Sequence, residues 1–164
     1  MDSDQNTATM ATIIKDSFTH RIRSVHVAGM EYFINVHLPL TYGMNQDSYP
    51  VIYYTDAFFA TEIVTGTKKI LEVSGKIANT ILVGISHEGD FMQFVSNRSR
   101  DLIPTHVPQN ELTVYPEATP ASGGADHFLA FIEHELFPLI EKEYRVDASD
   151  RGLIGSSYGG LFAA

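Results

Sequence analysis

A short pattern of glycine and serine near the end of the chain has the residue types and the spacing of a reactive serine. Gly155, Ser157 and Gly159 form the motif G-x-S-x-G, with the apolar stretch 152–154 before it and the apolar stretch 161–164 after it. A strand, a sharp turn and a helix in this order expose a serine on strained backbone, and the free N–H groups of the helix N-terminus face an oxyanion. We therefore predict that Ser157 is the nucleophile of a nucleophile elbow.

Length and composition favour one globular domain and exclude several kinds of chemistry. The chain has 164 residues, 44% of them hydrophobic, and it has no cysteine, which excludes disulfides and thiolate catalysis. The net charge of −9 and the lack of clustered Lys and Arg argue against a nucleic-acid partner. Apolar runs fall short of the roughly 18 residues of a membrane span, and the polar N-terminus does not look like a signal peptide. We expect no membrane partner and a cytoplasmic location.

The chain before the motif predicts an α/β fold. Strands within 17–28 and 32–38 are close in sequence and indicate an antiparallel hairpin. The stretches 50–56 and 79–85 are almost continuously apolar, as strands of a parallel sheet buried on both faces are, and 61–74 between them has helical spacing. A strand, a helix and a strand make a right-handed βαβ unit, which is typical of α/β proteins.

Two helices and one long loop complete the predicted domain. The apolar face of helix 61–74 is formed by Ile63, Val64, Ile70, Leu71 and Val73. Residues 86–121 show no clear period and are predicted to be a long loop, which in a compact domain is usually functional. Residues 125–144 form the clearest helix, with Pro138 expected to bend or restart it. Its inner face is predicted to be Phe128, Leu129, Ile132, Leu136, Leu139 and Ile140, and its outer face Glu133, Glu135, Glu141 and Lys142.

Four segments, 49–56, 97–105, 123–128 and 155–160, occur in the same order in the putative esterase family of α/β hydrolases. The chain resembles this family, which contains siderophore esterases and relatives of esterase D, from about residue 15 onward. The resemblance implies an α/β-hydrolase sheet with an N-terminal antiparallel hairpin. It also implies a serine carboxylic-ester hydrolase that acts on a small-molecule ester without a cofactor.

The resemblance gives roles to residues that match the family pattern. Ser157 would attack an acyl carbonyl, and the backbone N–H of Tyr158 would be one oxyanion donor. The second donor would be the N–H of Ala57 or Phe58, just after the first buried strand. Many relatives have Asp-Gly where this chain has Asp56 followed by alanine, which leaves the identity of the second donor open.

Two arginines lie where the family has an Arg-rich segment ending in Asp-Leu-Thr-Pro, with Ile103 in place of the usual threonine. The resemblance implies that Arg98 or Arg100 binds an anionic part of the substrate or braces the acyl pocket. The other interpretation is that Arg100 forms a structural ion pair with Asp101 that pins the loop.

The acid and the histidine of this family follow the serine in sequence, and this chain has neither after its serine. Only seven residues follow Ser157, and none is Asp, Glu or His. Among the seven histidines, His87 and His106 are predicted near the carboxyl edge of the sheet, as substitute bases or as polar loop residues. His134 is followed by Glu135 but by no second histidine that would complete an H-E-x-x-H zinc motif, so no metal site is predicted.

We therefore expect residues 1–14 to be a flexible N-terminus and 15–164 to be the N-terminal portion of a longer hydrolase, truncated after the elbow. This portion would be inactive alone, and its exposed edge strand would be a site for self-association. Two other functions stay open. One is a non-catalytic fragment or pseudoenzyme that acts as an interaction module, and the other is an acyltransferase that passes the acyl group to an alcohol instead of water.

Overall fold

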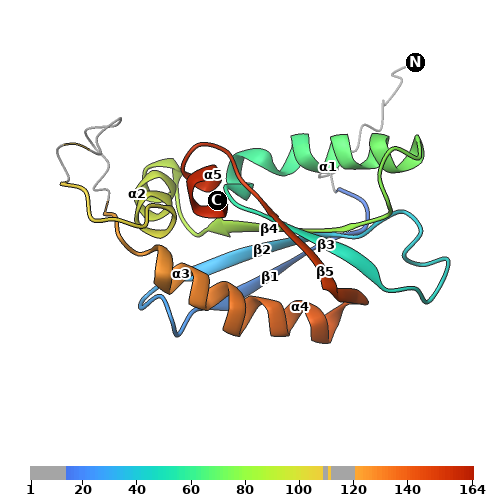
Figure 1. Ribbon diagram of the computed structural model, residues 1–164, viewed down its shortest axis with the longest axis horizontal. Helices are drawn as coiled ribbons and strands as arrows, with labels where there is room; N and C mark the ends of the chain where they lie inside the picture. Colours follow the sequence, from blue (N-terminus) through green and yellow to red (C-terminus); the bar gives the residue numbers. More distant parts are fainter. Residues whose placement is uncertain (1–13, 109–110, 112–120) are drawn as a thin grey trace, which may run out of the picture.

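A five-stranded mixed sheet forms the centre of the molecule, with the strand order β1-β2-β4-β3-β5 (Figure 1). The structure is a computed structural model that describes residues 14–108, 111 and 121–164. The strands are β1 (Ser17–Arg23), β2 (Glu31–His37), β3 (Tyr49–Tyr54), β4 (Ile81–His87) and β5 (Val146–Ile154). β2 pairs antiparallel with β1 and β4, whereas β3 pairs parallel with β4 and β5. This sheet confirms the predicted α/β fold and its N-terminal hairpin, while the expected flexible segment 1–14 lies almost wholly outside the described residues.

Helices cover both faces of the sheet (Figure 1). The helical elements are α1 (Ala57–Val73), α2 (Phe91–Leu102), α3 (Ala125–Phe131), the π-helical segment η2 (Ile132–Leu136), α4 (Phe137–Glu143) and α5 (Tyr158–Ala163). α1 lies on one face, and the continuous run of α3, η2 and α4 lies on the other, where the larger core is formed. α2 and α5 pack together at the end where β3, β4 and β5 finish.

The strand patterns explain which strands occupy the middle of the sheet. All seven residues of β4 are buried, in keeping with its continuous apolar sequence and its place between β2 and β3. β2 alternates instead, and its side chains Tyr32, Ile34 and Val36 are completely buried. β5 is an edge strand of the described sheet and is longer than the predicted stretch 152–154. Most of its residues are exposed, including Ile154 at 45%.

The prediction of one long loop over 86–121 is wrong in its first part, because α2 occupies twelve of these residues. The helix begins after Asp90, whose carboxylate accepts hydrogen bonds from the N–H groups of Met92 and Gln93. The Gln93 side chain returns a bond to the Asp90 N–H and completes a capping box. The buried positions of α2 are Phe94 and Leu102 together with the polar Ser99 and Asp101, so an argument from apolar residues alone recognises only part of its inner face. Residues 109–110 and 112–120 of the predicted loop lie outside the described part.

The prediction for the inner face of α1 is also wrong for three of its five residues, whereas Val64 and Leu71 are half-buried and Val64 packs against a small buried cluster. The helix begins at Ala57 rather than near residue 61, and the side chains that it buries include Thr61, Thr65 and Lys68. The predicted core residues Ile63, Ile70 and Val73 are 73%, 71% and 75% exposed. The physical reason is a polar layer between α1 and the sheet.

Two contacts form this polar layer. The Thr61 hydroxyl lies 3.1 Å from the Tyr54 hydroxyl, and the Lys68 ammonium lies 3.2 Å from the carboxylate of Glu72. Both charged side chains of this ion pair are almost completely buried. A hydrophobicity scan assigns such residues to the solvent-exposed face, so it misplaces part of the buried face of α1.

The long helix on the other face agrees with its predicted limits, and Glu133, Glu141 and Lys142 of its predicted outer face are exposed, whereas Glu135 is not. Phe128, Ile132, Leu136 and Ile140 are buried as expected, whereas Leu129 is 43% exposed. Glu135, predicted to lie outside, is mostly buried and accepts bonds from the Ser24 hydroxyl and the N–H groups of Val25 and His26. It thereby holds the turn between β1 and β2. Pro138 lies in the first turn of α4, directly after η2, as expected for a residue that restarts the helix.

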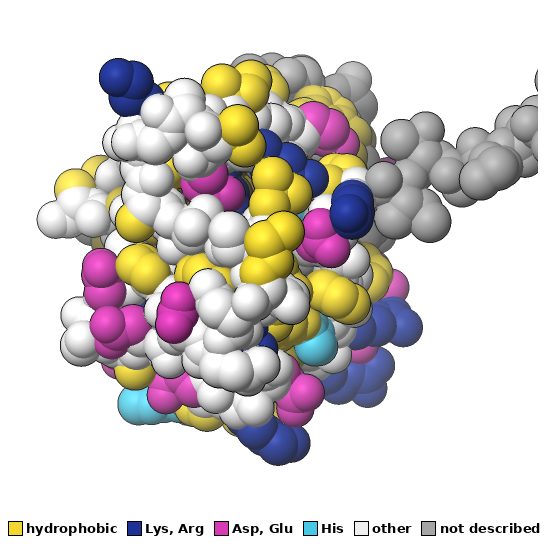
Figure 2. Space-filling view, turned by 90° about the vertical axis from the view of Figure 1, so that its right-hand side faces the viewer, with side chains coloured by type: hydrophobic (Ala, Val, Ile, Leu, Met, Phe, Trp, Pro, Cys, Tyr) yellow, Lys and Arg dark blue, Asp and Glu magenta, His cyan; other side chains and the backbone are white. Residues whose placement is uncertain are grey.

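The end of the molecule away from α5 carries acidic and basic side chains interspersed with apolar ones (Figure 2). No single sign of charge dominates this face among the described residues that it shows. None of the helices in the described part of the chain combines the length and the hydrophobicity that crossing a bilayer requires.

Candidate active site

Ser157 lies in the sharp turn between β5 and α5, as the motif predicts. Its backbone angles are φ 56° and ψ −123°, a conformation that a residue with a side chain rarely adopts. A Cβ atom at Gly155 would lie 2.2 Å from the carbonyl carbon of Gly159, and one at Gly159 would lie 2.1 Å from the Thr55 hydroxyl. Only glycine therefore fits at either position, and the close approach of strand and helix leaves Ser157 exposed.

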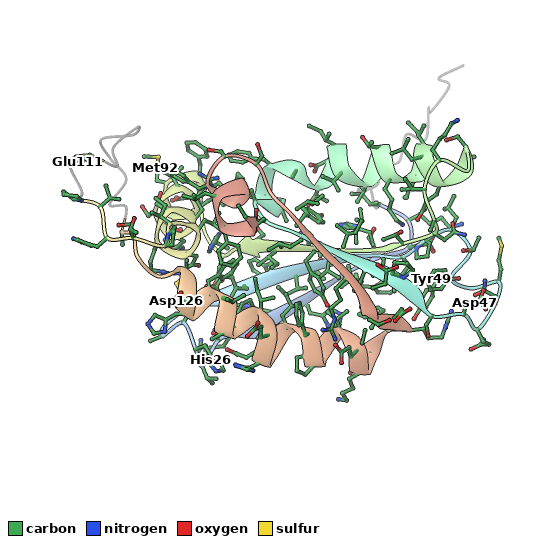
Figure 3. All side chains as sticks on the ribbon, viewed as in Figure 1. His26, Asp47, Tyr49, Met92, Glu111 and Asp126 are labelled. Carbon is green, nitrogen blue, oxygen red and sulfur yellow. The ribbon has the colours of Figure 1, made fainter. Side chains whose placement is uncertain are left out.

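A pocket of about 510 Å³ opens beside Ser157. It is mainly aromatic and apolar, with contributions from the start of α1, from one side of α2 and from the elbow. Its described lining consists of Asp56, Phe59, Ala60, Phe91, Phe94, Val95, Arg98, Ser99, Ser156, Ser157 and Tyr158. In Figure 3, Met92 of α2 lies at the same end of the molecule as α5, and Tyr49 and Asp47 lie at the opposite end. An apolar pocket with a few polar groups at one side is typical of a small-molecule site.

The predicted oxyanion donors lie at the beginnings of two helices that meet at this pocket. Tyr158 is the first residue of α5, and Ala57 and Phe58 are the first two residues of α1. N–H groups in the first turn of a helix have no acceptor within that helix, so they are available to an anion. Asp56, directly before Ala57, is left-handed with φ 57°, which turns the chain sharply from β3 into α1.

The two arginines of α2 have different surroundings. Arg98 lines the pocket and donates from Nε and Nη2 to the two carboxylate oxygens of Asp56, both at 2.7 Å. Arg100 is not among the pocket-lining residues, and its guanidinium pairs with the completely buried Asp101 at 2.6 Å. The ion pair between Arg100 and Asp101 that the sequence suggested is therefore present.

His87, considered above as a substitute base, is buried and does not line the pocket beside Ser157. Its Nε2 lies 2.8 Å from Asp101, which also accepts a 2.7 Å hydrogen bond from the Tyr32 hydroxyl. Burial, and then the negative charge of Asp101, raise the pKa of Tyr32 well above its usual value, so the hydroxyl stays a donor. His106 is exposed, with its backbone against Gly123. Of the described residues that line the pocket, none is a histidine.

Sequence reasoning missed the ion pair partner and much of the pocket wall. Asp56 lies two residues after a buried strand, which is a recognisable signal for a residue at the functional edge of a parallel sheet. Phe91 and Phe94 were missed together with α2, and the capping signature of Asp90 and Gln93 would have revealed that helix.

Metal-binding side chains do not gather at one point in the described ranges 14–108, 111 and 121–164, where no group of three or more His, Cys, Asp or Glu could hold an ion. His134 instead lies beside His26, with ring centroids 5.3 Å apart, on the helix that packs against the turn between β1 and β2.

Known proteins match this chain over most of its length. Residues 25–164 match the family described as "Putative esterase". The chain is 38% identical over 121 residues to the ferri-bacillibactin esterase BesA of Bacillus subtilis, a match that covers 70% of this chain and 40% of that protein. It is 32% identical over 146 residues to the siderophore enterobactin esterase of Emericella nidulans, covering 80% and 46%. Among solved structures, the BES protein from Bacillus cereus superposes with a TM-score of 0.79 at 28% identity, over 97% of this chain and 58% of that one. The chain spans less than half of the length of the two curated relatives.

Proposed function

The chain belongs to the esterase family and shares its α/β-hydrolase type of fold, and on that premise we propose that it is the nucleophile-bearing part of a serine carboxylic-ester hydrolase. The observation that carries the proposal is the position of Ser157. It lies at a positive φ of 56° in a sharp turn between a strand and a helix N-terminus, exposed beside an aromatic pocket of about 510 Å³.

In the proposed reaction, the Ser157 hydroxyl oxygen attacks the ester carbonyl, and its proton passes to a general base. The negative charge that develops on the carbonyl oxygen is stabilised by the N–H of Tyr158 and by the N–H of Ala57 or Phe58. The carbon–oxygen bond to the alcohol then breaks, the alcohol takes a proton and leaves, and the acyl group stays on Ser157. Water adds to this acyl-enzyme and releases the acid.

The general base is proposed to come from outside the residues of this chain. No Asp, Glu or His follows Ser157 in the sequence, and the described lining of its pocket contains Asp56 but no histidine. Both carboxylate oxygens of Asp56 already accept hydrogen bonds from the guanidinium of Arg98. Residues 1–164 alone are therefore expected to bind esters without turning them over.

The substrate is proposed to be a small-molecule ester. The names of the two curated relatives, a ferri-bacillibactin esterase and a siderophore enterobactin esterase, make siderophore esters the first substrates to test. The wall formed by Phe59, Phe91 and Phe94 favours an apolar or aromatic group next to the scissile bond.

A second candidate function rests on β5. This strand is an edge of the described sheet, and Ile154 at its end is 45% exposed. An unpaired edge with apolar residues pairs readily with another strand, so residues 1–164 alone are expected to self-associate. Sedimentation of this chain at increasing concentration tests that expectation, and a monomer throughout would contradict it.

Two neighbouring serines of the same pocket give a matched test of the proposed nucleophile. We expect the product of the complete reading frame to hydrolyse 4-nitrophenyl esters, Ser157→Ala to lose at least about 10³-fold in kcat, and Ser156→Ala to keep most of its rate. A fluorophosphonate should modify Ser157 and no other serine, as read by peptide mass spectrometry. Full activity of Ser157→Ala would refute the esterase mechanism.

A further inference from the structure

A two-pronged ion pair joins the wall of the pocket to the end of β3. Nε and Nη2 of Arg98 each donate a 2.7 Å hydrogen bond to a different carboxylate oxygen of Asp56. Both side chains are mostly shielded from water, with 15% and 14% of their surface exposed. Parallel charge-assisted bonds of this kind fix the orientation of both partners as well as their distance.

The same arginine also touches the elbow. Its Cζ atom lies 5.0 Å from the centre of the Tyr158 ring and 5.9 Å from that of Phe94, within the range of cation–π contacts. Tyr158 is the first residue of α5, and Asp56 is the residue before α1. Arg98 therefore contacts the starting points of both helices whose N–H groups are the candidate oxyanion donors.

The backbone of Asp56 needs such a contact. Its φ of 57° is a left-handed conformation that is unfavourable for a residue other than glycine. The peptide that follows Asp56 carries the N–H of Ala57, so a rotation of Asp56 toward ordinary angles would change the direction of this N–H. The two bonds from Arg98 hold the carboxylate, and through it the backbone, in the left-handed form.

The helix that carries Arg98 is itself anchored. Three residues further along α2, the completely buried Asp101 accepts a hydrogen bond from Tyr32 of β2 and contacts His87 of β4. These contacts link α2 to two strands in the middle of the sheet and so fix the position of the helix that carries Arg98.

We infer that Arg98 and Asp56 form a clamp that positions the two oxyanion donors, and that Arg98 is a positioning residue rather than a binding site for a substrate anion. This inference rests on the proposed esterase function. The charge of Arg98 is already balanced by Asp56, and its Nε and Nη2 are occupied, so the pair as a whole offers little attraction to an anionic substrate.

The test compares a neutral and an anionic ester in the product of the complete reading frame. The substrates are 4-nitrophenyl butyrate and the mono-4-nitrophenyl ester of glutaric acid, and the variants are Arg98→Gln, Asp56→Asn and the two together. The clamp predicts that each single variant lowers kcat about 10- to 100-fold on both esters with little change in KM, because an oxyanion donor is displaced. The double variant should be no worse than either single one.

The control is Arg21→Gln, which removes an exposed ion pair with Glu31 and Glu88 and should leave both rates unchanged. Arg98→Lys, which keeps the charge but not the two-pronged geometry, should also lose kcat, and it replaces Arg98→Gln if the latter does not fold. The clamp is overturned if Arg98→Gln raises KM for the glutarate ester alone and Asp56→Asn leaves the butyrate rate unchanged.

A second measurement is independent of turnover. In the amide NMR spectrum of the product of the complete reading frame, Arg98→Gln should shift the signals of Ala57 and Tyr158, Asp56→Asn should shift that of Tyr158, and Arg21→Gln should shift neither. If the wild-type protein hydrolyses no ester but these shifts occur, the proposed function fails and the clamp stands. If neither signal moves, the clamp fails whatever the activity.

Discussion

Replacing Gly155 by alanine should force β5 and α5 apart at the elbow. The new Cβ atom would lie 2.2 Å from both the carbonyl carbon and the carbonyl oxygen of Gly159, so the backbone must move by more than about 1 Å to reach an ordinary contact distance. Overpacking against side chains costs typically about 1–3 kcal/mol, and a backbone obstacle cannot relax by changing rotamer. We expect a loss of at least about 3 kcal/mol in the free energy of unfolding.

Gly66→Ala is the matched control, because it makes the same chemical change without a clash. Gly66 lies within α1, and a Cβ atom there would have no neighbour within 4 Å. Alanine in a helix interior is more favourable than glycine, so this variant should gain about 0.5–1 kcal/mol. The two substitutions should therefore change stability in opposite directions.

Urea unfolding followed by circular dichroism measures both variants, and the rate of Ser157 phosphonylation by a fluorophosphonate reports on the elbow itself. Gly155→Ala should lose most of this rate even under conditions where it is folded, whereas Gly66→Ala should keep it. If Gly155→Ala unfolds within about 0.5 kcal/mol of the wild type and reacts at the wild-type rate, the steric account of the elbow is wrong.

Two further predictions concern pH and the cap of α2. Burial, then the charges of Lys68 and Lys69, lower the pKa of His37 to about 4. The contribution of neutral His37 to the free energy of unfolding is therefore fully present above the unfolded pKa of about 6.5, and about 3 kcal/mol of it is lost as the pH falls through 4. His37→Gln should remove this part of the loss in urea unfolding at pH 7.5 and pH 4.5, and an unchanged difference in stability between the two pH values would contradict the assignment. Asp90→Ala should destabilise the chain by about 1 kcal/mol because the N–H groups of Met92 and Gln93 lose their acceptor, and an unchanged urea midpoint would count against the cap.

Four of the five strands, β1 to β4, could be predicted from the sequence because their side chains obey simple rules. The continuous apolar runs of β3 and β4 indicate burial on both faces, and the hairpin of β1 and β2 follows from two adjacent strands joined by a short turn. The order of the elbow elements could also be predicted, since Gly155 and Gly159 meet a steric demand that no other residue satisfies.

The helices that were misread break the same rules for physical reasons. α1 buries Lys68 and two threonines, because they find partners there, and exposes Ile63 and Ile70. α2 buries Asp101, because Tyr32 supplies a hydrogen bond across the core. A pattern of apolar residues carries no information about polar partners, whether they are near in sequence, as Glu72 is to Lys68, or distant, as Tyr32 is from Asp101.

The candidate site was predictable only in part for a related reason. Ser157 belongs to a local motif, but the bond between Arg98 and Asp56 joins residues that become neighbours only through the fold. The sequence suggested a role for Arg98, and it contained no sign that an aspartate at the end of β3 would occupy its guanidinium.

The parallel pairing of β3 with β5 has a consequence for the order in which the molecule is assembled. Tyr49 pairs with Val146, and Tyr54 with Ile154, so this ladder joins segments that are 97 to 100 residues apart in sequence. Contacts between such distant segments form late in folding, because a long loop must be closed before they contribute any stability. Asp56 and Ser157 therefore stay apart until β5 docks, and a nascent chain should expose a reactive serine only after its other strands have already formed.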